Sequence, residues 1–109
     1  MGFLKQLSGN EIVYIINDKI IEDKIIKKII KDINPDYKIG FDMRNVKSLS
    51  SALFLKYLNC NKYKLYNLQN EVLTYLSIVI KSGRLKSYMN YEDFKNNKRE
   101  LIKRRFSVV

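Results

Sequence analysis

The chain has 109 residues and a mass of 13.0 kDa, which suits one domain and leaves too little chain for two separate hydrophobic cores. Hydrophobic residues make up 46% and charged residues 29%, an ordinary globular composition that argues against general disorder. Lysine and arginine number 21 against 11 acidic residues, so the formal charge of +10 favours anionic partners such as nucleic acid, acidic proteins or lipid headgroups.

Several kinds of chemistry are excluded by the residues that the chain lacks. It contains no histidine, which removes the side chain that most often transfers protons near neutral pH and excludes serine–histidine catalysis. Its one cysteine, Cys60, cannot form an internal disulfide or a cysteine-rich zinc site, and we interpret it as a small, half-buried helix residue. The four glycines form no phosphate-binding loop. We therefore expect no catalytic residues, metal or cofactor.

The location of the protein is predicted from two further patterns. The first residues lack the long apolar run of a signal peptide, and no run of about 18 apolar residues occurs that would cross a membrane. A lone thiol also suits a reducing compartment. These patterns predict a soluble, cytoplasmic protein.

The first half of the chain predicts two strands separated by a helix. Residues 11–16 are β-branched and aromatic between polar neighbours, which is typical of a buried strand. From about Asp23 isoleucines recur at helical spacing opposite lysines, so an amphipathic helix should run to Asn34 and Pro35. Residues 37–43 form the next predicted strand. Residues 1–10 could add an edge strand or remain loose, and the pattern leaves both open.

The second half continues the alternation. Ser50 and Ser51 can cap a helix that stops near Asn59, a strand follows at 63–68, and Asn70 can cap a helix that ends with Gly83 in a left-handed cap. A short strand at 85–89 and a last helix, capped by Asn90 and running to about Arg105, complete the chain. The helix positions expected to be buried are Ile25, Ile26, Ile29, Ile30 and Ile33, then Leu53, Phe54, Tyr57 and Leu58, then Val72, Leu73, Leu76, Val79 and Ile80.

This order predicts a single α/β domain over residues 1–109. Strands that alternate with helices through short connections favour a mostly parallel, mixed sheet of four to five strands with about four crossover helices.

Residues 39–53, IGFDMRNVKSLSSAL, resemble the core segment of STAS domains, the family that includes the bacterial anti-sigma factor antagonists. The family pattern is an apolar strand, Asp or Asn, spaced apolar residues, and then Asp-Ser-Ser-Gly at the start of a helix. The positions that fit are Asp42, Met43, Asn45, Val46 and Leu49. Residues 66–73 are similar to the family's strand–turn–helix, and residues 82–85 to its Ser-Gly-Leu turn. The resemblance implies a STAS-like fold.

The resemblance also implies a function. It makes the chain a non-catalytic regulatory module that binds a protein partner, an anti-sigma kinase by analogy, and Ser51 falls on the family's phospho-acceptor serine. Ser50 and Leu53 stand where the family has Asp and Gly, and residues 18–21, DKII, replace a Gly-Glu-Leu-Asp stretch. The contact residues implied are Ser48, Ser50, Ser51, Ala52 and Phe54. The alternative is that Ser50 and Ser51 only cap the helix.

The basic C-terminus suggests a second function. Residues 95–109 carry six cations and one acid, and the cations surround the expected helix instead of sharing one face. An apolar stripe on the same helix favours docking on the sheet, with basic side chains extending into solvent. A small basic nucleic-acid-binding protein, or one that binds an acidic protein or lipid surface, remains the alternative. Its anion-binding residues would be Lys98, Arg99, Lys103, Arg104 and Arg105.

Overall fold

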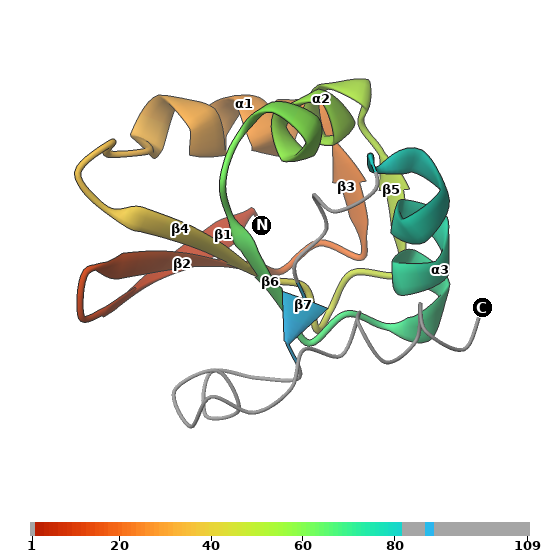
Figure 1. The fold of residues 1–109 in the computed structure, drawn as a ribbon, viewed down its shortest axis with the longest axis horizontal. Helices are drawn as coiled ribbons and strands as arrows, with labels where there is room; N and C mark the ends of the chain where they lie inside the picture. The colour runs from red at the N-terminus through yellow and green to blue at the C-terminus, as the bar shows by residue number, and fades with distance from the viewer. Residues whose placement is uncertain (1, 82–86, 89–109) are drawn as a thin grey trace.

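A mixed sheet of five strands forms the centre of the molecule in a computed structural model that describes residues 2–81, 87 and 88 (Figure 1). Its strands, in spatial order, are β1 (Phe3–Ser8), β2 (Glu11–Ile16), β4 (Lys38–Asp42), β6 (Lys64–Tyr66) and β7 (Ser87–Tyr88). Two further strands, β3 (Ile20–Glu22) and β5 (Ser48–Ser50), pair with each other alone. The helices are α1 (Asp23–Asp32), α2 (Ala52–Cys60) and α3 (Asn70–Val79).

The first residues of the chain form an edge strand, which settles the question that the sequence left open. β1 pairs antiparallel with β2 through a tight turn in which Gly9 has φ +63°, a backbone conformation that glycine adopts without strain. The other neighbours, β2 with β4, β4 with β6 and β6 with β7, are parallel. The sheet is therefore mixed and mostly parallel, as predicted.

One face of this sheet carries the hydrophobic core. Alternation along β2 directs Ile12, Tyr14 and Ile16 toward the helices, and Phe41 of β4 continues the same layer. Figure 1 shows α1 and α2 over this face, with α3 beside β5. The opposite face carries the smaller cluster of Val13 and Tyr66. Apart from the exposed Lys38, the residues of β2, β4 and β6 are buried or half-buried on both faces, as is typical of parallel strands.

The helices bury most of the predicted stripes. In α1 the buried residues are Ile25, Ile26 and Ile29, whereas Ile30 is 38% exposed, so the buried stripe is narrower than the isoleucine pattern predicts. The side chain of Asp32 at the end of α1 accepts the Tyr14 hydroxyl at 2.9 Å and pairs with the Lys5 ammonium at 2.8 Å. These contacts join the end of α1 to both strands of the first hairpin.

Both predicted ends of α3 are wrong. Asn70 is its first helical residue, and the N-cap is Gln69, whose side chain makes no capping bond. The helix ends at Val79, and Ile80 adopts an extended conformation with its side chain in the core, so the helix stops before it could use Gly83 as a cap. Burial of Ile80 therefore takes precedence over the local glycine signal.

The described part of the chain contains three helices, one fewer than expected. The fourth predicted helix, together with the anion-binding candidates Lys98, Arg99, Lys103, Arg104 and Arg105, lies outside the described residues. None of the described helices has the length and hydrophobicity needed to span a bilayer.

Candidate functional site at the start of α2

Ser51 stands between the short strand β5 and helix α2, where it makes two hydrogen bonds. Its Oγ accepts the Phe54 N–H at 3.0 Å, so Ser51 is the N-cap of α2, as the sequence predicts. The same hydroxyl donates to Oδ1 of Asp23 at 2.6 Å. Asp23 also lies 3.4 Å from the backbone N of Leu53. A carboxylate of α1 therefore closes the N-terminus of α2.

The β3–β5 pair explains why these two side chains meet across 28 residues of sequence. The two strands run parallel, with Glu22 opposite Ser50 at their ends. α1 begins directly after β3, and α2 begins one residue after β5. Asp23 and Ser51, the next residues after the paired positions, are consequently neighbours. The N-termini of the two helices meet at this point.

The electrostatics of the site favour an ionised Asp23. The Ser51 hydroxyl is the largest cause that lowers the pKa of this carboxyl below its ordinary value, and the Leu53 N–H and Lys27 act in the same direction. Desolvation opposes them. The positive ends of both helix dipoles also favour negative charge here. The Asp23 carboxylate therefore already occupies the place at which a second anion would be stabilised.

The remaining contact candidates divide into exposed and buried residues. Ser48, Ser50 and Ala52 are exposed around Ser51, which is itself only 3% exposed. Phe54 is 1% exposed and packs edge-on against Phe41 at a centroid distance of 5.3 Å. Its side chain belongs to the core, so the prediction that Phe54 contributes to a contact surface is wrong. A phenylalanine at the third position of α2 points inward because it continues the buried stripe of that helix.

A second polar cluster ties together the carboxyl ends of β4 and β6. The fully buried Asp42 receives a bidentate contact from the Arg44 guanidinium, with Nε 3.1 Å from Oδ1 and Nη2 2.6 Å from Oδ2, and a hydrogen bond from the Asn67 amide at 3.1 Å. Asn67 has φ 60°, an uncommon left-handed conformation for a residue other than glycine. A buried carboxylate needs such partners, so this cluster has a sufficient structural explanation.

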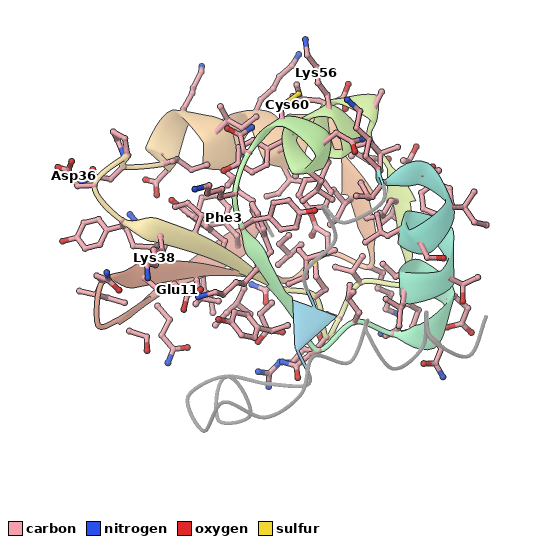
Figure 2. All side chains as sticks on the ribbon, viewed as in Figure 1. Phe3, Glu11, Asp36, Lys38, Lys56 and Cys60 are labelled. Carbon is pink, nitrogen blue, oxygen red and sulfur yellow. The ribbon has the colours of Figure 1, made fainter. Side chains whose placement is uncertain are left out.

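Sequence reasoning missed Asp23 as a member of the site and misplaced Cys60. Asp23 gave only the local signal of an acid in the first turn of a helix, because its contact with Ser51 depends on the pairing of two strands. Cys60 is exposed at the end of α2, on the same outer side of the molecule as Lys56 (Figure 2), so the half-buried interpretation is wrong. The described residues include no cluster of three side chains suited to hold a metal ion.

The fold and the site define an α/β domain with a mixed sheet and a serine–carboxylate contact between two helix N-termini. No protein-family model, curated protein or solved structure matches the chain.

Proposed function

We propose that the chain is a non-catalytic, STAS-like regulatory module that binds a protein partner at the start of α2 and is switched by phosphorylation of Ser51. The observation that carries this proposal is the Ser51 hydroxyl, which links the first turn of α2 to the Asp23 carboxylate at 2.6 Å. A charge added to this one oxygen would act on both helices. No catalytic residue is required for such a function.

The order of elements in the two resembling segments supports the proposal. Residues 39–53 run from β4 through β5 into α2, with Ser51 as the residue before the helix. Residues 66–73 run from the end of β6 into α3. Both segments therefore have the strand-to-helix order that the family pattern implies. Position 50, where the family pattern has Asp, is a serine here, and the carboxylate that contacts Ser51 is that of Asp23 in α1.

The surface around Ser51 suits close approach of another protein. Ser48, Ser50 and Ala52 have small, uncharged side chains and are exposed. Ile20, which lies opposite Ser48 in the β3–β5 pair, is 49% exposed and adds an apolar contact. We define the contact surface as Ile20, Ser48, Ser50 and Ala52; the exposed Glu22, opposite Ser50, adds one negative charge beside it. Short side chains let a partner reach the strand and helix backbone directly.

Phosphorylation would change this surface by charge. A phosphate adds about −1.5 to −2 units of charge at neutral pH. On Ser51 it would face the Asp23 carboxylate and would replace the proton that the hydroxyl now donates, so the hydrogen bond between Ser51 and Asp23 would be lost. Separation of Asp23 would release the Leu53 N–H, and this first-turn amide of α2 could then stabilise the phosphate. Because Ser51 is only 3% exposed, a kinase reaches its hydroxyl only when the contact with Asp23 opens.

The test is capture of partners from the source cytoplasm by the tagged chain, with Ser51→Asp and the control Thr74→Asp. Thr74 is an exposed residue of α3 outside the contact surface, so this control adds the same charge away from both Asp23 and the partner. We expect one protein to be held by the unmodified chain and by Thr74→Asp, at about 50 and 200 mM salt, and to be lost with Ser51→Asp. Mass spectrometry of chain incubated with that partner and ATP should place phosphate on Ser51.

Two other results would contradict the proposal. Phosphorylation of Ser48 or Ser50 in place of Ser51 would show that Ser51 is not the residue that controls binding. The captured material could instead be lost on nuclease treatment, fall by orders of magnitude between the two salt concentrations, and be the same with serine or aspartate at position 51. That result would favour phosphate-dominated nucleic-acid binding by the basic C-terminus.

A further inference from the structure

Strand β1 presents an unpaired edge of the five-stranded sheet. The Asn17 N–H donates to the Gly2 carbonyl at 2.9 Å, so Gly2 directs its carbonyl toward the β2 side. Hydrogen-bonded and non-hydrogen-bonded residues alternate along an antiparallel pair. The backbone N–H and C=O groups of Leu4, Gln6 and Ser8 therefore point toward β2, as the Gly2 carbonyl does. The backbone N–H and C=O groups of the three intervening residues, Phe3, Lys5 and Leu7, point away from the sheet, and within the described residues nothing pairs with them.

Apart from Lys5, this edge lacks the features that usually prevent strands from pairing between molecules. Natural edge strands are commonly short, bulged, interrupted by proline or protected by lysine. β1 has six residues in unbroken register with β2 and contains no proline. Its one charged residue, Lys5, is paired with Asp32 at 2.8 Å. Leu4 and Leu7 are 59% and 63% exposed, on opposite faces of the strand.

We infer that β1 pairs with β1 of a second copy of this chain, antiparallel and about a two-fold axis at Lys5, so that the two five-stranded sheets become continuous. A two-fold axis perpendicular to the sheet keeps the faces of both copies aligned, so residues of the same face must lie opposite each other. With the axis at Lys5, Phe3 lies opposite Leu7 of the other copy, and Lys5 lies opposite its own counterpart. Phe3, Lys5 and Leu7 of each copy then all form backbone hydrogen bonds with residues of β1 in the other copy.

The alternative registers are poorer. An axis at Gln6 pairs Lys5 with Leu7 but moves Phe3 opposite Gly9, which belongs to the turn. An axis at Leu4 pairs Phe3 with Lys5 but moves Leu7 opposite Met1. Each of these registers uses only two of the three outward-facing residues within the strand. The register centred on Lys5 is therefore the one in which β1 best complements itself.

The side chains favour a second copy as the occupant. In the Lys5-centred register the exposed Leu7 lies beside Phe3 of the other copy, on the face that carries the helices. Phe3 already packs there, edge-on to Tyr14 at a centroid distance of 5.4 Å. The two Lys5 ammonium groups approach the axis, and each brings its own Asp32 carboxylate, so the charges at the axis compensate. The apolar contact extends an existing core layer.

Lys5→Pro, with Lys5→Ala as its control, tests the pairing. Proline removes the outward-facing N–H, which the monomer does not use, whereas alanine keeps it; both variants lose the ion pair with Asp32. Sedimentation of the full chain over a concentration series should show a monomer–dimer equilibrium. We expect Lys5→Pro to raise the dimer Kd by at least about tenfold, because one hydrogen bond is lost from each copy. Lys5→Ala should keep the dimer.

Residue-resolved amide exchange gives a measurement on the unmodified chain. Raising the protein concentration should slow exchange at Phe3, Lys5 and Leu7 and leave Leu4 and Gln6 unchanged. Salt should strengthen the dimer, because both copies carry +10 and screening reduces their repulsion. A chain that stays monomeric throughout, a dimer indifferent to Lys5→Pro, or exchange that ignores concentration at these three amides would overturn the inference. None of these measurements involves Ser51.

Discussion

At the scale of single residues, the Ser51 hydroxyl has a role that few other side chains could take. A hydroxyl has one proton to donate and lone pairs to accept with, and Ser51 uses both, toward Asp23 and toward the Phe54 N–H. Alanine would lose both bonds. Aspartate would keep an acceptor for the helix but would offer no proton to Asp23. Substitution by alanine therefore tests the loss of the helix cap, whereas substitution by aspartate tests the added charge.

We expect Ser51→Ala to lower the free energy of unfolding by about 0.5–2 kcal/mol, the usual cost of losing a serine N-cap. Ser51→Asp should also destabilise the fold, because two carboxylates then face each other. Asp23→Asn should offset much of that loss, since an amide can donate to the new carboxylate. Urea unfolding of the single and double variants measures this coupling, and raising the salt concentration should weaken the repulsion. Additive effects would show that Asp23 and position 51 do not interact.

At the scale of elements, β4 is shaped by the close approach of its neighbours. A Cβ placed on Gly40 would lie 2.7 Å from Oε2 of Glu11 and 2.9 Å from the Tyr66 ring. The Tyr66 hydroxyl donates to the nearly buried Glu11 carboxylate, with its oxygen 2.9 Å from Oε2 and 3.1 Å from Oε1. The missing side chain at Gly40 thus lets Tyr66 of β6 reach across β4 to Glu11 of β2. Three strands are joined on the face away from α1 and α2.

Gly40→Ala should therefore destabilise the protein by about 1–3 kcal/mol, the usual cost of overpacking a buried position. Glu11→Ala removes the atom in closest contact, so Gly40→Ala should cost less in that background than in the unmodified chain. Thermal unfolding of the unmodified chain, the two single variants and the double variant gives both costs. An equal cost in the two backgrounds would show that Glu11 is not what limits the space at position 40.

The same scale shows which elements could be predicted. β2, α1 and α2 follow from local periodicity and capping, and their bounds agree closely with the pattern. The three-residue strands β3 and β5 were not predicted, because neither has enough residues for a period and each exists only by pairing with the other. The site depends on that pair, so Ser51 could be found from its local cap, whereas Asp23 could not.

At the scale of the whole molecule, ionisable side chains limit the pH range of stability from both sides. Hydrogen bonding from Lys5 and Tyr14 lowers the pKa of Asp32, and Ser51 lowers that of Asp23, so both carboxylates stabilise the fold above about pH 4 and this contribution is lost as the pH falls below it. Both are solvated, so the acid effect is small. The alkaline side depends on buried tyrosines.

Stability should fall as the pH rises above about 10. Burial raises the pKa of Tyr14 above its ordinary value of 10.0, with further contributions from Asp32 and Tyr57, and burial also raises the pKa of Tyr57. Above pH 10 the unfolded chain releases these protons while the folded chain retains them, so ionisation favours unfolding. Lys64 opposes this trend, because burial lowers its pKa. Because two tyrosines act against one lysine, the net result is a loss of stability.

Tyr14→Phe isolates the largest part of this effect. The variant should be less stable by about 0.5–1.5 kcal/mol below pH 10, because it loses the 2.9 Å hydrogen bond to Asp32, and its stability should decline less steeply above pH 10. Tyr75→Phe is the matched control, because it removes a tyrosine hydroxyl from a side chain that is 41% exposed. Urea unfolding from pH 8 to 11 measures these slopes. Equal slopes for Tyr14→Phe and the unmodified chain would mean that ionisation of Tyr14 does not drive alkaline unfolding.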